Sequence, residues 1–272
     1  RLADFGIDRH YPEIAAPETR HPYGALLDAV IARQARLIAQ WMLLGFIHGV
    51  MNTDNMSISG ESIDFGPCAF MEAYDPATVF SSIDVAGRYA YSNQPPIALW
   101  NLTRLAESLL PILEAEAGDK DAALASAKDS LAVFQPQFEA AFLAGLRRKL
   151  GLTTQHESDP KLIAGLFDRM AANHAAFTLT FRRLCTAASQ SECAAAPQAD
   201  STSGPDSTPR SLFDDPAAFD AWAAQWRLRP APSTLSPCHS TSPRRTASIP
   251  APSSPRTKIS PNAPSPRFPT ST

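Results

Sequence analysis

The stretch that decides the fold is HGVMNTDNMSISGESIDFG, at residues 48–66. It gathers three side chains with hard oxygen atoms, Asp54, Asn55 and Asp64. Carboxylate and amide oxygens are the ligands that Mg²⁺ and Mn²⁺ prefer in proteins. The stretch therefore predicts a site for a divalent metal that draws its ligands from these three residues.

A change of pattern in the middle of this stretch predicts how its two arms meet. Apolar and polar residues alternate over 56–59 and again over 62–65, on either side of Gly60 and Glu61. Such alternation around a glycine turn is typical of a short β-hairpin. We expect the hairpin to fold Asp64 back towards the loop that carries the other ligand.

The spacing within the stretch is similar to that of kinase loops. In kinase-type enzymes, a loop Asn and the Asp of an Asp-Phe-Gly segment hold the metal that bridges the nucleotide phosphates. Here Asn55 follows His48 by seven positions, as in the kinase loop, and Asp64 opens an Asp-Phe-Gly segment. The kinase base would stand two residues after the histidine, where Val50 cannot accept a proton. Asp54 is the carboxylate left in this loop as a candidate general base.

Structural explanations compete with each of these assignments. An isolated Asp-Phe-Gly is weak evidence, because any strand that ends at a glycine turn can carry it. A lone loop histidine such as His48 more often hydrogen-bonds to backbone than acts in catalysis. Asn52 and Thr53 are typical turn formers. The joint pattern, rather than any one residue, favours a metal and nucleotide site.

Composition excludes several other classes of function. The 272 residues carry a net charge of -3 with a pI near 6.1, and no basic stripe suggests nucleic-acid binding. Four widely spaced cysteines form no CxxC pair, which argues against a zinc site or a disulfide framework and favours a reducing compartment. The longest apolar stretch, over residues 37–50, is shorter than the roughly 20 residues that a membrane helix needs.

Hydrophobic periodicity predicts a mainly α-helical chain. The helices that we expect cover residues 23–46, 97–113, 120–150 with a kink or break at Pro136, 160–185, and 216–227. A mostly helical body with one short β-hairpin after a buried helix is the layout expected of a protein-kinase-like C-terminal lobe.

The chain divides by composition into three zones. Residues 1–152 form the predicted kinase-like core with its catalytic and metal loops, and 153–229 continue the helical lobe. Residues 230–272 are rich in Pro and Ser with few large apolar residues, so we expect a disordered tail. Composition shifts abruptly where this tail begins, which favours an out-of-frame reading over a genuine extension. The chain opens on Arg1, which suggests that the natural start is missing.

Two long motifs resemble one family closely. HGVMNTDNMSISGESIDFGPCAFMEAYDP (48–76) and GRYAYSNQPPIALWNLTRLAESLLPIL (87–113) are similar to the selenoprotein O family, called YdiU in bacteria. The resemblance covers residues 3–113 and continues more weakly to Arg229. It implies a kinase-like fold that transfers AMP from ATP to Ser, Thr or Tyr hydroxyls of proteins, in the bacterial cytoplasm or in mitochondria.

The same resemblance assigns roles to the residues of the stretch. It implies Asp54 as the proton acceptor, Asn55 and Asp64 as ligands of Mg²⁺ or Mn²⁺, and Asp64 as a contact of ATP. The family's N-terminal lobe, with its phosphate-binding groups, has no counterpart here, so a truncated and weakly active or inactive form is expected. The partners implied are ATP and protein substrates, without nucleic acid or membrane. A kinase-fold phosphotransferase and a non-catalytic pseudokinase remnant are the alternatives.

Overall fold

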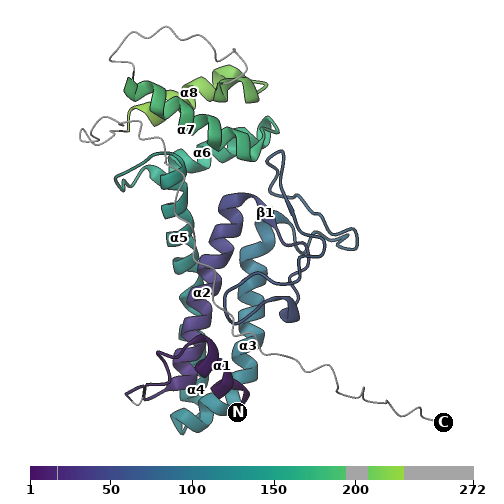
Figure 1. The fold of residues 1–272 in the computed structure, drawn as a ribbon, viewed down its shortest axis with the longest axis vertical. Coiled ribbons are helices and arrows are strands. Elements are labelled where there is room, and N and C mark those ends of the chain that lie inside the picture. Colours follow the sequence, from purple (N-terminus) through teal and green to yellow (C-terminus); the bar gives the residue numbers. More distant parts are fainter. Residues whose placement is uncertain (17, 194–207, 230–272) are drawn as a thin grey trace, which may run out of the picture. The chain divides into compact units, whose positions relative to one another are not determined.

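The computed structural model describes residues 1–16, 18–193 and 208–229. Within these ranges the chain is mainly helical and carries a two-stranded antiparallel sheet (Figure 1). The elements are α1 (Leu2–His10), α2 (Pro22–Leu44), β1 (Phe46–Ile47), η1 (Thr53–Asn55), β2 (Ala69–Phe70), η2 (Tyr91–Asn93), α3 (Gln94–Ala117), α4 (Lys120–Ala132), α5 (Phe134–Lys149), α6 (Asp159–Ala172), α7 (Phe177–Cys193), η4 (Pro209–Leu212) and α8 (Pro216–Arg227). The tail expected from residue 230 lies outside the described residues.

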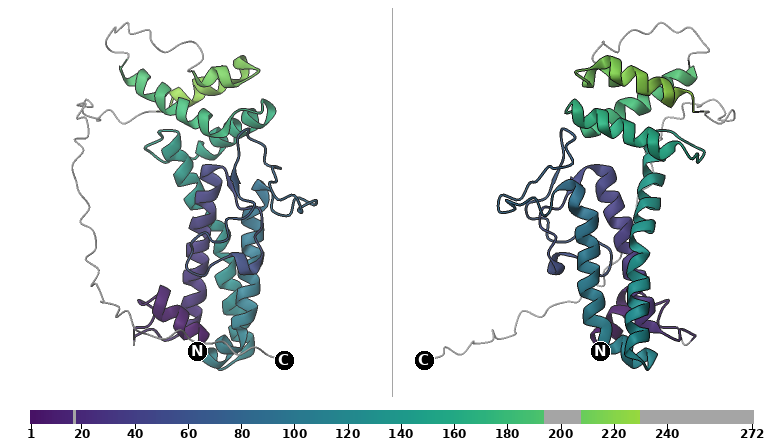
Figure 2. Two further views of the ribbon diagram at one scale, coloured as in Figure 1. Left: turned by 45° about the vertical axis from the view of Figure 1, so that its right-hand side comes forward. Right: turned by 180° about the vertical axis from the view of Figure 1, so that it is seen from behind.

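Helix α2 is the centre of the packing. Its buried residues recur at three- and four-residue spacing, which places them on one broad face of a helix with 3.6 residues per turn. They include Leu27, Val30, Ile31, Ala35, Ile38 and Trp41. Helix α2 packs against α3, α4 and α5, and Figures 1 and 2 show α2, α3 and α5 side by side from several directions. The helix predicted over 23–46 is confirmed, with its end two residues earlier.

Prolines lie near the starts of α3 and α5. Pro95 and Pro96 lie in the first turn of α3, where a missing N–H removes no intrahelical hydrogen bond. A break within 120–150 is confirmed, but α4 and α5 separate at Val133 and not at Pro136, where the sequence predicted it. Pro136 lies in the first turn of α5, so it marks the start of the second helix.

The prediction of one continuous helix over 160–185 is wrong. Helix α6 ends at Ala172 and α7 begins at Phe177, and His174 between them has a left-handed φ of 47°. The connecting segment hydrogen-bonds to the chain that follows β2. The Tyr74 N–H donates to the Ala175 carbonyl (2.9 Å), and the Phe177 N–H donates to the carbonyl of Glu72 (2.7 Å). These long-range bonds replace the helical ones.

The predicted hairpin over 56–65 is also wrong in extent. Its arms meet at a single antiparallel bridge between Met56 and Ser62. The regular sheet lies outside them, where Phe46 pairs with Phe70. The arms form no ladder because helix side chains take their backbone carbonyls: Gln34 of α2, for example, donates to the Ser57 carbonyl.

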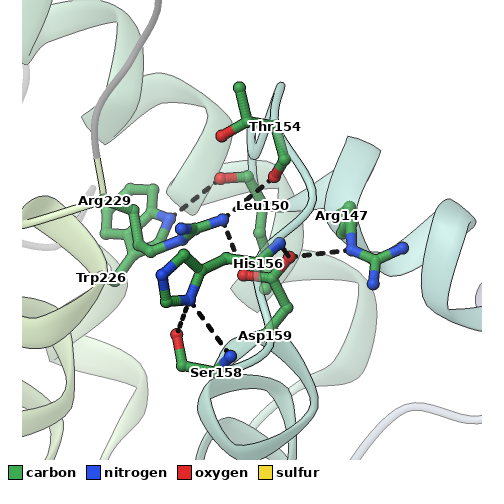
Figure 3. A network of polar contacts seen from close by, with 8 residues as sticks. All are labelled: Arg147, Leu150, Thr154, His156, Ser158, Asp159, Trp226 and Arg229. Carbon is green, nitrogen blue, oxygen red and sulfur yellow. Dashed lines mark hydrogen bonds and ion pairs between the residues drawn. The ribbon is translucent and has the colours of Figure 1, made fainter.

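A buried charge network attaches the last helix to the rest (Figure 3). Asp159, at the start of α6, is fully buried and accepts from Arg147 of α5 at 2.8 Å. Its other oxygen lies 2.7 Å from a guanidinium nitrogen of Arg229, just after α8. Beside them, the indole N–H of Trp226 donates to the Leu150 carbonyl. The network joins α5, α6 and the end of α8, and the helix predicted over 216–227 is confirmed.

Candidate functional site

The polar stretch singled out by the sequence forms the loop between β1 and β2. Gly45 follows the last residue of α2, and its left-handed φ of 69° lets the chain turn into β1. Gly49 also has a positive φ, and a Cβ there would lie 2.9 Å from the Pro67 carbonyl oxygen. The two ends of the loop therefore cross closely, and glycine permits the crossing.

Helix α3 holds the first part of the loop through two buried amide side chains. Gln94 accepts from the His48 N–H (3.0 Å) and donates to the Phe46 carbonyl (2.9 Å). About two helical turns further along α3, Asn101 donates to the carbonyl of Met51 (2.9 Å). These bonds satisfy backbone groups that the short strands leave unpaired. They fix the loop's path before it reaches the candidate ligands.

Helix α2 holds the second part of the loop in a similar way. Gln34 donates to the Ser57 carbonyl, and the Trp41 indole N–H donates to the hydroxyl of Ser62 (2.8 Å). The loop is thus bound from two helices that themselves pack together. Its backbone is fixed by core elements, although many of its side chains reach solvent.

His48 has a structural role, as its surroundings show. It is fully buried, and its ring lies against that of Trp41 with centroids 5.3 Å apart. Its Nε2 is 2.8 Å from the Ile63 carbonyl oxygen. Since a carbonyl oxygen only accepts, Nε2 carries the proton and the ring joins the two arms of the loop. The backbone-binding role that is usual for such a histidine is confirmed.

Asn55 presents an oxygen to the site because its nitrogen is already used. It ends η1, and its Nδ2 donates to the Val50 carbonyl across the loop (3.1 Å). The amide must be oriented this way, because the Val50 carbonyl cannot donate. The Oδ1 atom is the one left to bind a ligand, and amide oxygens suit hard cations.

Asp64 lies on a constrained backbone. Its φ of 54° is in the left-handed region, which residues other than glycine rarely occupy. The Gly66 N–H donates to the Asp64 carbonyl (2.9 Å), which closes a tight turn over Asp-Phe-Gly. The side chain is exposed. Strain of this kind, about 1–3 kcal/mol, persists where surrounding structure imposes it and is common at functional sites.

Asp54 lies in the middle of η1 with an exposed side chain. Within the described residues, neither its carboxylate nor that of Asp64 has a hydrogen-bond or ion-pair partner. The bridge between Met56 and Ser62 brings the two arms together one residue after Asn55 and two before Asp64. The sequence-predicted residues therefore lie on adjoining arms, with their oxygen atoms uncommitted.

The donor set suits a metal that arrives with a nucleotide better than one held by protein alone. In the part of the chain that the structure describes, no group of three or more His, Cys, Asp or Glu side chains could hold a metal ion. Asn55 and Asp64 offer two oxygen ligands, and Mg²⁺ typically takes one or two such ligands and completes its shell with phosphates and water. The residues present fit that mode of binding.

The residues that position the loop are not among those that the sequence motifs single out. Gln34, Gln94 and Asn101 are polar residues on otherwise apolar helix faces, and all three are buried. Such residues need hydrogen-bond partners, so each one signals a backbone segment that packs against the helix. That signal was present in the apolar stripes of both helices.

Comparison with known protein families assigns the chain to one family. Residues 1–236 match the family described as protein adenylyltransferase SelO, which covers most of the sequence. The chain belongs to this family of nucleotidyltransferases. Among the described helices, none is long and apolar enough to cross a membrane.

Curated bacterial relatives carry the name protein nucleotidyltransferase YdiU. One from Bradyrhizobium sp. is 59% identical over 229 residues, which are 84% of this chain and 43% of the relative. One from Methylorubrum populi is 59% identical over 228 residues, or 84% of this chain and 44% of the relative. One from Rhodopseudomonas palustris is 57% identical over 228 residues, with shares of 84% and 43%. The chain spans less than half the length of these relatives.

Proposed function

We propose that residues 48–66 form the metal- and nucleotide-binding loop of a protein adenylyltransferase with a kinase-like fold. The activity is transfer of AMP from ATP to Ser, Thr or Tyr hydroxyls of proteins, and we propose it for the whole protein. The observation that carries the proposal is the pair of exposed, uncommitted carboxylates of Asp54 and Asp64 on a loop fixed from two core helices. The chain's membership of the SelO family supports nucleotidyl transfer as the reaction class.

In this proposal Asn55 and Asp64 hold Mg²⁺ or Mn²⁺ through Oδ1 and a carboxylate oxygen. Such an ion, when bound with ATP, neutralises charge on the phosphates. Asp64 also borders the nucleotide. The constrained backbone at Asp64 fixes the position from which its side chain extends. This restricts the orientations that the carboxylate can adopt toward the metal.

Asp54 is the proposed general base. The acceptor hydroxyl oxygen attacks the α-phosphorus, the bond from that phosphorus to the bridging oxygen breaks, and pyrophosphate leaves. The hydroxyl proton passes to the Asp54 carboxylate. Val50, two residues after His48, cannot take this role. The reaction is at the α-phosphorus and not at the γ-phosphorus as in kinases. The base therefore need not lie where kinases have it, two residues after the histidine.

The test is a chimera in which residues 1–229 of this chain replace the matching part of the Bradyrhizobium relative. It is incubated with Mg²⁺ and ATP labelled at either the α- or the γ-phosphate. We expect label on protein from the α position alone. Label from the γ position alone would establish the phosphotransferase instead. If the relative is active but the folded chimera transfers no label, the non-catalytic remnant is supported.

The Asp54→Asn variant of this chimera tests the base. Loss of a general base slows a reaction by about 10²–10⁴-fold, and we expect a decrease in turnover within that range. Mn²⁺–ATP affinity should stay unchanged, because Asp54 is not a proposed ligand. Turnover within a factor of about two of the parent would exclude Asp54 as the base.

A further inference from the structure

An exposed arginine lies over two aromatic rings in the segment between β2 and η2. The guanidinium carbon of Arg88 is 4.8 Å from the ring centroid of Trp100 and 5.7 Å from that of Tyr89. The Asp84 carboxylate fixes the backbone here, because it accepts from the N–H groups of Arg88 (2.8 Å) and Tyr89 (2.7 Å). The arginine therefore extends from a fixed turn, and its charged end is held against aromatic side chains.

Both rings beside Arg88 are tied to the residues that precede η1. The Tyr89 hydroxyl donates to Oδ1 of Asn52 (2.7 Å), the residue immediately before η1. The next residue after Trp100 in α3 donates its amide N–H to the Met51 carbonyl. These two connections hold the guanidinium group beside the N-terminal end of η1, the short helix that carries the proposed base.

Arg88 forms no ion pair with the described residues, in contrast to a second arginine at the same ring. In those parts of the chain its guanidinium group has neither a hydrogen-bond nor an ion-pair partner. The guanidinium carbon of Arg104 lies 5.3 Å from the Trp100 centroid, and its charge is paired with Glu107 at 2.7 Å. Of this pair of arginines, Arg88 is the one whose charge is available to an anion.

The chemistry of this group suits a carboxylate. A guanidinium group over an aromatic ring keeps its N–H donors, which form a planar fork that matches the two oxygens of a carboxylate. Trp100 is 43% exposed, so a ligand on Arg88 also meets an apolar surface. The aromatic contacts restrict the arginine before a ligand arrives, which reduces the side-chain entropy lost on binding.

The place of Arg88 along η1 favours a ligand on the acceptor protein over one on the nucleotide. The proposed metal ligands are Asn55, at the C-terminal end of η1, and Asp64, on the other arm of the loop. Arg88 lies at the opposite end of η1, with the proposed base Asp54 between. In the proposed reaction ATP and its metal occupy the end with the ligands, which leaves the end with Arg88 to the acceptor.

We propose that Arg88 selects acceptor proteins that carry an Asp or Glu side chain close to the hydroxyl that receives AMP. Its guanidinium group binds that carboxylate through two N–H groups and so directs the hydroxyl towards Asp54. Arg88 takes no proton and is a specificity-determining residue. The inference rests on the proposed adenylyl transfer, because it concerns the acceptor of that reaction.

Peptide acceptors that differ in one charge test the inference without any substitution in the protein. The chimera is incubated with Mg²⁺, α-labelled ATP and peptides that contain one Ser and one Glu, with the Glu placed at each flanking position in turn. Matched peptides carry Gln in place of Glu. We expect the best Glu peptide to exceed its Gln partner about tenfold or more in kcat/KM, as a hydrogen bond between charged groups does. Equal values at every position would overturn the inference.

Two arginine variants of the chimera assign this preference to one residue. Arg88→Gln should bring the ratio of Glu to Gln peptides to within about twofold of one, mainly through a higher KM for the Glu peptide. Arg104→Gln is the matched control and should keep the preference, because its arginine contacts the same ring but is already paired. An unchanged ratio in Arg88→Gln, an equal loss in Arg104→Gln, or a raised KM for ATP instead of the peptide would each contradict the assignment.

Labelling of protein separates this inference from the function on which it rests. If the chimera transfers α-label neither to protein nor to any peptide, the proposed function fails and the inference fails with it. If the chimera labels protein but prefers no Glu peptide over its Gln partner, the inference alone is overturned.

Discussion

Two sets of carboxylates in this chain have opposite surroundings. Asp159 is fully buried, and its oxygens face Arg147 at 2.8 Å and Arg229 at 2.7 Å. Asp54 and Asp64 are exposed, without a hydrogen-bond or ion-pair partner within the described residues. A carboxylate whose oxygens are occupied joins helices, whereas one with uncommitted oxygens on a fixed loop is available to a cation or a proton. The contrast separates the residue that stabilises the fold from those that we propose for chemistry.

The protonation of Asp159 follows from its surroundings. Burial by itself raises the pKa of this carboxyl, but the His156 N–H and the guanidinium groups of Arg147 and Arg229 outweigh it and lower the pKa below its ordinary value. The charged form is therefore favoured by folding. Its contribution to stability is present above the pKa of the unfolded chain and is lost as the pH falls through the lower folded value.

Asp159→Ala should give the largest loss of stability. It leaves two guanidinium groups without their buried partner, and breaking a buried ion pair costs about 3–5 kcal/mol. Urea denaturation measures the change in the free energy of unfolding. The matched control is Asp220→Ala, which breaks the exposed pair with Arg210 and should cost less than about 1 kcal/mol. Equal losses in the two variants would contradict the distinction between buried and exposed carboxylates.

Gln94→Leu should have the next largest effect. It leaves the His48 N–H and the Phe46 carbonyl unpaired at a fully buried position, which costs about 2 kcal/mol. Amide hydrogen exchange should accelerate at His48, because the loop loses its anchor to α3. The control is Gln135→Leu, at an exposed position where the lost bond joins Glu139. Unchanged exchange at His48 would show that Gln94 does not hold the loop.

Lys149→Met should have the smallest effect, and one that depends on pH. Burial lowers the pKa of Lys149 to about 8, while the charge of Cys185 opposes the shift. The ammonium nitrogen donates to the Leu43 carbonyl and lies 4.0 Å from the ring centroid of Phe181. Between the folded pKa and the higher unfolded one, the unfolded chain binds more protons, so the lysine's contribution to stability becomes more favourable as pH rises.

Thermal unfolding at a series of pH values checks this sign. The melting temperature of the parent relative to Lys149→Met should rise between pH 8 and pH 10. Taking the difference between the two melting temperatures cancels the titration of groups common to both proteins. A constant or falling difference would mean that Lys149 is not desolvated by folding.

The sequence predicted most helices because their information is local. Apolar spacing placed α2 and α3, and prolines marked the starts of α3, α5 and α8. The break between α6 and α7 was missed because residues 173–176 contain neither glycine nor proline. It arises from hydrogen bonds to residues 72 and 74, a cause that periodicity does not reveal. The prediction of a hairpin over 56–65 was wrong for a related reason, because side chains of helices outside it bind its arms.

The residues of the candidate site also fall into those that local sequence reveals and those that it does not. Residue type and spacing were enough to single out Asp54, Asn55 and Asp64, and the structure places all three on one supported loop. Their roles as base and ligands stay predictions. Sequence spacing did not reveal Gln94 and Asn101, because these residues act on backbone groups more than forty positions away.

The central claim is that Asp64 is a ligand and Asp54 is not. Isothermal titration of Mn²⁺–ATP into the chimera and into its Asp64→Asn and Asp54→Asn variants tests it directly. Asparagine keeps the size of each side chain and tolerates the left-handed backbone at position 64. We predict affinity at least about tenfold weaker for Asp64→Asn, because the ligand loses its charge, and unchanged affinity for Asp54→Asn. Equal affinities for parent and Asp64→Asn would contradict the account.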